Sequence, residues 1–266
     1  MSRRDYLEDA RKRLLQGIGV PEQAAFVPDD FQLEAIEHAA SGEDVLVVAP
    51  TGAGKTYIAI QAIEKALKMG NRAVYTTPLK ALSNGKFADL KLRFEPMGYR
   101  VGLLTGDRKI EGDSQCVVAT TEIYRNELYR GSERPSLVVL DEVHFISDPQ
   151  RGPVWEESII LTSHASTLLM LSASIGNARE IADWISDTRG KPCHIVTKKE
   201  RPVELRYGFI HPELGILPLR DESGGVFPEV AKFYGGAGLD ASGMRLKGGR
   251  FQSDRRDHRQ GRGNRR

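Results

Sequence analysis

The stretch at residues 49–56 has the composition of a loop that binds phosphate groups. It reads Ala-Pro-Thr-Gly-Ala-Gly-Lys-Thr and follows a short apolar run. Gly52 and Gly54 would let backbone N–H groups approach phosphate oxygens, and a helix beginning at Lys55 would add its partial positive charge. The lysine can reach the outer phosphates, and the hydroxyl of Thr56 can bind Mg²⁺. We therefore expect ATP to be bound by Thr51, Gly52, Ala53, Gly54, Lys55 and Thr56.

Two acidic residues, Asp141 and Glu142, directly follow the apolar run Leu137–Leu140. An aspartate at the end of a strand is well placed to hold Mg²⁺, often through water, and the glutamate beside it can polarise the attacking water. An Asp-Glu pair alone is common at the solvated start of a helix, but here a phosphate loop precedes it. We therefore predict three catalytic residues, Lys55, Asp141 and Glu142. The Mg²⁺ ligands would be Thr56 and Asp141.

Five other residues have weaker signals, which spacing alone leaves open. His144 lies two residues after Glu142 and could link the acidic pair to the turn that carries Ser172 and Ser174. Small hydroxyl residues are equally ordinary in turns. Gln32 has an amide that could pair with adenine, and Phe26 could stack on the base. A surface glutamine and a core phenylalanine are the commoner explanation of such a spacing.

The elements that must position these residues alternate between strand and helix along most of the chain. Apolar runs predict strands at 45–49, 73–77, 101–104, 116–119, 137–140, 168–171, 195–197 and 203–209. Helical spacing predicts helices at 5–16, 30–40, 55–69, 79–94, 122–130, 154–161 and 178–185. Apolar strands separated by helices indicate an α/β fold with a mostly parallel sheet and helices on both faces. Both motifs follow strands, so they should meet at the carboxyl edge of that sheet.

The composition is that of a soluble globular protein, with 40% apolar and 28% charged residues. The two cysteines, Cys116 and Cys193, are isolated, which argues against a disulfide framework and against a structural zinc site. The first residues contain no apolar signal segment, and no run is long enough to cross a membrane. We therefore expect a cytoplasmic protein with no membrane partner.

The charge is unevenly distributed along the chain. Residues 244–266 contain nine Lys and Arg against two Asp, although the whole chain has a net charge of only +2. Beyond about residue 212 the alternation of strand and helix stops and glycine becomes frequent. We predict a helical extension at 1–23, an ATP-binding domain at 24–212, and a disordered Gly/Arg-rich basic tail at 213–266.

Eight stretches resemble, in order and spacing, the first RecA-like domain of a superfamily 2 DExH-box helicase, and more narrowly the superkiller-type RNA helicases. They are Phe31–Ile36, Ala49–Thr56, Thr76–Asn84, Gly102–Asp107, Thr120–Ile123, Asp141–His144, Arg151–Glu157 and Leu171–Asn177. The resemblance covers residues 24–212 and implies a RecA-like P-loop fold. It also implies ATP and Mg²⁺ as cofactors, and hydrolysis coupled to the binding of single-stranded RNA.

The resemblance gives roles to the residues that spacing left open. Phe26 and Gln32 would recognise adenine. His144, Ser172 and Ser174 would couple hydrolysis to strand movement. The implied nucleic-acid contacts are Pro78, Leu79, Lys80, Ser83, Gly106, Asp107, Thr120, Thr121 and Glu122. Contacts of this kind to phosphates carry no sequence information, as a translocating motor requires.

Helicases of this family continue into a second RecA-like domain that supplies arginine fingers, worth roughly 10³–10⁵-fold in rate in related systems. This chain has room for the first domain only, so the resemblance implies weak hydrolysis unless a second RecA-like domain or another subunit acts in trans. Two other classes stay open. One is a nucleotide-gated RNA-binding module that uses the basic tail and does not unwind. The other is a DNA helicase of a sister group, because phosphate contacts do not identify the sugar.

Overall fold

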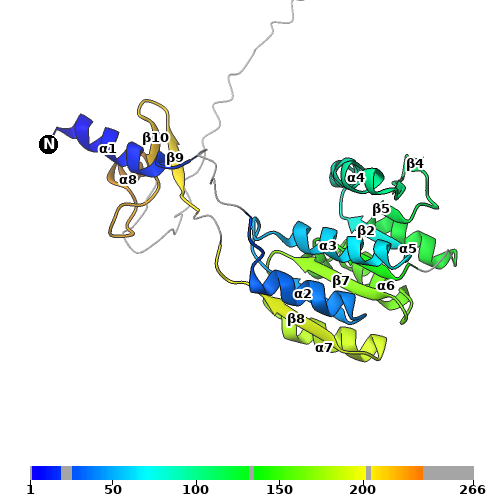
Figure 1. Cartoon of the computed structure of the whole chain (residues 1–266). Coiled ribbons are helices and arrows are strands. Elements are labelled where there is room, and N and C mark those ends of the chain that lie inside the picture. The colour runs from blue at the N-terminus through cyan, green and yellow to red at the C-terminus, as the bar shows by residue number, and fades with distance from the viewer. Residues whose placement is uncertain (1, 19–25, 132–134, 202–204, 236–266) are drawn as a thin grey trace, which may run out of the picture. The chain divides into compact units, whose positions relative to one another are not determined.

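The computed structural model describes residues 2–18, 26–131, 135–201 and 205–235. Its contacts divide the chain into two units, drawn in Figure 1. The larger unit is Ala25–Val203, and the smaller one combines Met1–Ala24 with Glu204–Arg266. The predicted nucleotide-binding and nucleic-acid-binding residues all belong to the larger unit.

An eight-stranded sheet forms the centre of the larger unit (Figure 1). Its order is β4-β3-β5-β2-β6-β7-β1-β8, and all neighbours are parallel except the antiparallel pair β3 and β4. The strands are β1 (Asp44–Val48), β2 (Ala73–Thr77), β3 (Val101–Leu104), β4 (Lys109–Ile110), β5 (Cys116–Thr120), β6 (Leu137–Leu140), β7 (Thr167–Ser172) and β8 (Cys193–Thr197). The central strands are buried on both faces, which explains their continuous apolar runs. The expected mostly parallel α/β fold is confirmed.

Helices cover both faces of this sheet. They are α2 (Asp30–Ala40), α3 (Lys55–Lys68), α4 (Lys80–Phe94), α5 (Thr121–Tyr129), α6 (Gly152–Leu161) and α7 (Ala178–Arg189). Apolar residues of α2, α3 and α4 share one core cluster with one face of the sheet. Apolar residues of α5, α6 and α7 share a second cluster with the other face. The carboxyl ends of the parallel strands are thereby left as the edge where loops can gather side chains.

Most element boundaries differ from the sequence-based ones by a few residues, and two strands differ more. The two-residue strand β4 was not predicted, because two residues give no periodicity to read. A strand was predicted at 203–209, but residues 205–207 are not in a strand, and residues 203–204 lie outside the described part. Strand β9 (Gly208–His211) begins where pairing with β10 (Gly215–Pro218) becomes possible.

The smaller unit consists of α1 (Arg3–Leu15), the hairpin β9–β10 and α8 (Pro228–Tyr234). Leu7 and Ala10 of α1 form a small core with Leu217, Phe227 and Val230. Helix α1 begins with a capping box, in which Ser2 and Asp5 each accept the other's backbone N–H. The two ends of the described chain therefore build one unit, instead of a separate extension and tail.

The predicted disordered tail at 213–266 is thus wrong for its first part. Residues 213–235 contain β10 and α8, while residues 236–266 lie outside the described part of the chain. The prediction failed because the three apolar residues that anchor this segment are spread over 14 positions and pack on a helix some 200 residues away, so no local periodicity marks them. Strand β9, placed at the end of the predicted domain 24–212, also belongs to this smaller unit.

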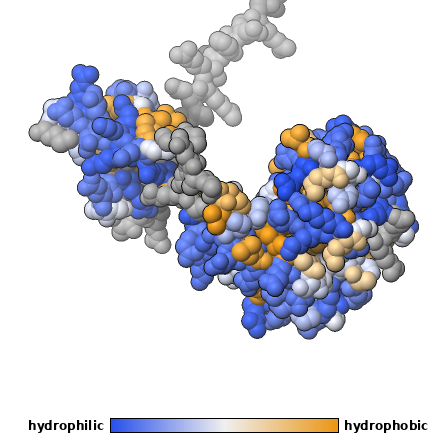
Figure 2. Space-filling view, in the orientation of Figure 1, coloured by the Kyte–Doolittle hydropathy of each residue, from blue (hydrophilic) through white to orange (hydrophobic). Residues whose placement is uncertain are grey.

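The face of each unit that Figure 2 shows is mostly hydrophilic, with separate hydrophobic patches. Scattered apolar patches of this kind are ordinary on soluble surfaces. None of the helices in the described ranges combines the length and apolar composition that spanning a bilayer would require.

Candidate functional site

The loop at residues 49–56 joins the carboxyl end of β1 to the start of α3, as predicted. Gly52 and Gly54 have φ angles of +88° and +83°, in the left-handed region that favours glycine. The Nζ atom of Lys55 lies over the loop and donates to the Ala49 and Pro50 carbonyls, at 2.7 and 3.1 Å. Its ammonium is thus held where backbone N–H groups and the helix terminus favour an anion.

Gln32 and Phe26 lie beside this loop. Gln32 is buried, donates from Nε2 to the Ala53 carbonyl at 3.0 Å, and accepts at Oε1 from the Asp29 N–H at 3.0 Å. A Cβ atom at Gly54 would stand only 2.3 Å from Gln32 Nε2, so the glycine is needed for this approach as well as for its φ angle. Phe26 is 65% exposed and packs on Tyr57, with ring centroids 4.8 Å apart.

An open groove runs past these side chains, next to the phosphate loop. It is lined by Phe26, Val27, Asp29, Gln32, Gly52, Ala53, Gly54, Lys198, Glu200 and Arg201. An exposed aromatic ring beside a partly satisfied amide fits a planar heterocycle, since the amide retains one N–H donor and one acceptor lone pair. The predicted adenine-binding residues are therefore brought together, although Gln32 also holds the loop itself.

The acidic pair follows β6 and points toward the phosphate loop. Asp141 accepts a hydrogen bond from the Tyr75 hydroxyl at 2.7 Å and one from the Glu142 N–H at 2.9 Å. Glu142 has a φ angle of +53°, which is uncommon for a residue other than glycine and is a form of strain that clusters at functional sites. Burial and the Coulombic interaction with Asp141 raise the pKa of Glu142. Burial lowers the pKa of Lys55, and the two carboxylates partly offset that effect.

Two residues of this site had no predicted role, Tyr75 on β2 and Lys86 on α4. The Nζ atom of Lys86 donates to Thr56 Oγ1 at 3.0 Å and lies 5.8 Å from the centroid of the Tyr75 ring. Burial and the neighbouring Asp141 raise the pKa of Tyr75 well above its usual range, so it stays a hydroxyl donor. No spacing in the sequence connects these residues, because they converge from different elements of the sheet.

Of the predicted coupling residues, His144 lies beside the acidic pair, and the described hydrogen bonds do not join the three residues into one network. His144 Nδ1 is 3.2 Å from Glu142 Oε2, yet the geometry makes no hydrogen bond, and both atoms are buried without such a partner among the described residues. Ser172 ends β7 with a buried and equally unpaired Oγ atom, and its carbonyl accepts from the Ala49 N–H at 3.1 Å. Ser174 is exposed in the following loop. These unpaired polar atoms would fit a bound polyphosphate and its water.

The predicted nucleic-acid contacts come from the carboxyl ends of β2, β3 and β5, which are neighbours in the sheet. Leu79, Lys80, Gly106 and Asp107 are exposed, and Lys80 Nζ lies 3.1 Å from an oxygen of Asp107. These exposed residues belong to different segments, but they lie within reach of one extended single-stranded nucleic acid.

Other predicted contacts lie below the surface and hold the loops. Ser83 is fully buried and shares a 2.7 Å hydrogen bond with the Thr77 hydroxyl. Thr121 is fully buried and donates to the Thr77 carbonyl at 3.2 Å. Pro78 and Thr120 are also buried. The contact of these four residues with nucleic acid stays a prediction.

Arg151, which had no predicted role, ties the loop after β2 to the start of α5. Its guanidinium donates to the Pro78 carbonyl and to the Glu122 carboxylate, the latter at 3.0 Å. The same group lies over the rings of Phe145 and Trp155, 4.9 and 5.4 Å from their centroids. Cation–π contact and a charge-assisted pair thus fix the loop after β2 to the first turn of α5, which directly follows β5.

A parallel sheet with a glycine-rich loop after one strand and an acidic pair after another defines an α/β domain of the P-loop, RecA-like class. Residues 29–181, more than half of the chain, match the model of the DEAD/DEAH box helicase family. The chain belongs to that family.

Similar curated proteins lie within the superkiller-type group. The chain is 45% identical over 193 residues to "DExH-box ATP-dependent RNA helicase DExH9" of Arabidopsis thaliana, covering 71% of this chain and 19% of that protein. It is 48% identical over 183 residues to "Probable helicase HelY" of Mycobacterium leprae, covering 68% and 20%. It is 43% identical over 183 residues to "Antiviral helicase SKI2" of Saccharomyces cerevisiae, covering 68% and 14%. The matches thus span a fifth or less of each relative.

Proposed function

We propose that this chain binds and hydrolyses ATP with Mg²⁺ and couples hydrolysis to movement along single-stranded RNA, as part of an ATP-dependent RNA helicase. One observation carries the proposal. Lys55 and the pair Asp141–Glu142 meet at the carboxyl edge of the sheet, closely enough for the two carboxylates to offset part of the lowering that burial causes in the pKa of Lys55.

Each residue of this edge has a role that its contacts support. The loop N–H groups and Lys55 would bind the β- and γ-phosphates. Thr56 and Asp141 would hold Mg²⁺, and the Tyr75 hydroxyl fixes the Asp141 carboxylate for that purpose. When bound, the metal ion would neutralise charge that develops on the phosphate oxygens. Glu142 has a raised pKa and an unpaired oxygen, which suits a base that orients and polarises water.

The RNA path is proposed along the carboxyl ends of β2, β3 and β5. Lys80 provides a cation for backbone phosphate, and the exposed Leu79 provides apolar surface. The buried hydroxyls of Ser83 and Thr121, together with Arg151, hold these segments in register with one another. Binding should therefore depend on salt and very little on sequence.

The test is ATP binding and turnover by the whole chain, with and without a single-stranded RNA of mixed sequence. We expect RNA to increase turnover, Glu142→Gln to retain ATP binding while abolishing turnover, and Lys55→Ala to lose ATP binding. Lys68→Ala is the matched control, since Lys68 lies on the same helix but exposed, paired with Glu64 at 2.8 Å. Unchanged ATP affinity in Lys55→Ala would refute the site.

A non-motor module is the second candidate, because the resemblance implies that a second RecA-like domain supplies the arginine fingers that speed hydrolysis. It predicts RNA binding that ATP strengthens or weakens, with no turnover under any condition. A DNA strand of the same sequence, tested in parallel, separates an RNA enzyme from a DNA enzyme.

A further inference from the structure

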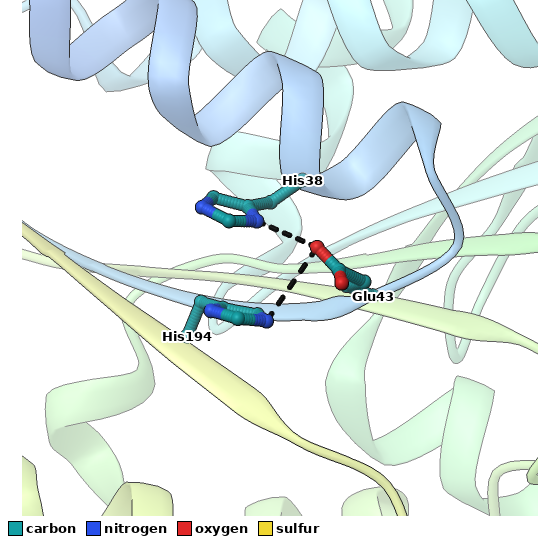
Figure 3. A group of neighbouring side chains, drawn as sticks. All are labelled: His38, Glu43 and His194. Carbon is teal, nitrogen blue, oxygen red and sulfur yellow. Dashed lines mark hydrogen bonds and ion pairs between the residues drawn. The ribbon is translucent and has the colours of Figure 1, made fainter.

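We propose that His38, Glu43 and His194 form a Zn²⁺ site on the larger unit, separate from the ATP site. Figure 3 shows the two imidazoles facing the same carboxylate oxygen. His38 Nδ1 lies 2.6 Å and His194 Nε2 lies 3.5 Å from Glu43 Oε2. The three candidate ligand atoms all lie within 4.8 Å of one another.

The fold brings these residues together from three adjacent segments. His38 is in the last turn of α2, and the turn into β1 reverses the chain at Gly42, whose φ angle of +86° favours glycine. The Glu43 N–H donates to the His38 carbonyl at 3.1 Å, which fixes the glutamate beside the helix end. His194 reaches the same point from β8, where it pairs in register with Val45 of β1.

The site lies at the amino edge of the sheet. Glu43 directly precedes β1, whereas the phosphate loop follows the other end of that strand. Five strand residues at roughly 3.3 Å each separate the two ends. An ion at this position therefore touches no residue that we assign to ATP or RNA.

The three candidate ligand atoms are of types that bind zinc, and the distances between them are close to those in a zinc site. Zinc binds imidazole nitrogen and carboxylate oxygen at roughly 2.0–2.2 Å in tetrahedral geometry, which places ligand atoms about 3.3 Å from one another. The separations of 2.6 and 3.5 Å lie on either side of that value. The two rings are stacked, with centroids 4.1 Å apart and planes 14° apart, so binding must turn them about χ2. That torsion is broad and costs little.

A second observation points to a missing partner at this place. His194 Nε2 is buried and makes no hydrogen bond with any described residue, although it faces the carboxylate. The three candidate ligand side chains are themselves partly open to solvent, which gives an ion a route of entry. The exposed fraction is 29% for His38, 41% for Glu43 and 34% for His194. The adjoining groove along α2 is acidic, with Asp30, Glu34, Glu37 and Glu43 among its lining residues.

These three side chains do not suit Mg²⁺, the metal proposed for the ATP site. Mg²⁺ prefers oxygen ligands and octahedral geometry, while two imidazoles and one carboxylate favour Zn²⁺. The nearby Cys193 is not a fourth ligand, because it packs in the core cluster on the opposite face of the sheet. Water would complete the coordination. The bound ion would fasten β8, which is an edge strand paired only with β1, to the end of α2.

The test uses the full chain, stripped of metal with a chelator and studied without nucleotide or Mg²⁺. Titration calorimetry with ZnCl₂ should show one Zn²⁺ per chain, and Zn²⁺ should raise the melting temperature of the larger unit reversibly. His194→Gln and His38→Gln should each weaken binding by about 100-fold or more, since even outer-shell changes cost up to that much. Co²⁺ should show the visible absorption of a tetrahedral site in the wild type only.

His211→Gln is the matched control, because it removes an imidazole from the smaller unit and should leave the titration unchanged. Circular dichroism in the presence of chelator checks that each variant is folded. A variant that fails this check is replaced by Glu43→Gln, which conserves size and removes the carboxylate. Equal Zn²⁺ binding by wild type and by folded site variants would overturn the proposal, as would no binding to the wild type at micromolar Zn²⁺. MgCl₂ should not compete.

Discussion

Replacing Arg189 with methionine tests how the larger unit holds the start of β1. Arg189 ends α7 with its side chain fully buried, against the equally buried Asp44 that begins β1. Its guanidinium donates to the Asp44 carboxylate and to the backbone carbonyls of Ile159, Thr162, Ser163 and Ser166. Several of these carbonyls lie at or just beyond the C-terminal end of α6, where no further helical N–H can satisfy them.

The loss can be estimated from these contacts. Removing one partner of a buried ion pair costs about 3–5 kcal/mol, because the other charge stays buried. Asp44 would keep Lys191 Nζ at 2.9 Å and the Leu168 N–H at 2.8 Å, which reduces its share of the loss. The carbonyls left without a donor raise it again. We expect a decrease of about 4 kcal/mol, a large part of the ~5–15 kcal/mol typical of a domain.

Urea denaturation followed by tryptophan fluorescence measures this loss. The chain has two tryptophans, Trp155 and Trp184, and both lie in the larger unit. Arg179→Met is the control, because Arg179 lies on the same helix with 85% of its side chain exposed and should change stability by less than about 0.5 kcal/mol. If Arg189→Met costs no more than this control, the buried pair does not hold β1 in place and our reasoning fails.

Three further predictions concern the nucleotide site and the sheet. Tyr75→Phe removes the hydrogen bond to a carboxylate, so the affinity for ATP with Mg²⁺ should fall about tenfold in fluorescence titrations, while affinity without Mg²⁺ should not change. Burial raises the folded-state pKa of Glu142. Ionisation of this carboxyl at neutral pH therefore destabilises the folded state, and the destabilisation is relieved as the pH falls through the folded-state pKa. Glu142→Gln should therefore raise the melting temperature at neutral pH, with a gain that shrinks on acidification; a gain that grows would contradict the shift. Gly102→Ala places Cβ 2.2 Å from a backbone oxygen of the β4 loop and should cost about 1–3 kcal/mol in urea melts, whereas Gly85→Ala meets open space in α4 and should be neutral or stabilising.

Local patterns in the sequence were enough to predict the parallel sheet and the two main motifs. The phosphate loop needs only a strand, two glycines and a helix start, and all of these are contiguous around Lys55. The acidic pair is recognisable because it directly follows an apolar strand. The order of the strands, by contrast, depends on packing between distant segments and has no local signal.

The supporting contacts of the site could not be predicted for the same physical reason. Tyr75 looks like a core residue of β2, yet its hydroxyl reaches Asp141, 66 positions away. Arg151 looks like a surface charge before a helix, yet it joins the loop after β2 to the first turn of α5. Ser83 and Thr121 are predicted as nucleic-acid contacts from the resemblance, and only the structure shows that both are buried with hydroxyls hydrogen-bonded to Thr77.

Helix α4 connects the proposed RNA path to the proposed ATP site. Its first turn carries Lys80 at the proposed RNA path, and Lys86 farther along donates to Thr56 at the ATP site. Six residues of helix span about 9 Å and bend little over that length. We therefore propose that a displacement of one end of this helix shifts the other end, which would link RNA binding at Lys80 to the nucleotide site at Thr56. Lys86→Ala should remove this link between the two sites. If the RNA affinity of this variant still responds fully to ATP, the proposed link is wrong.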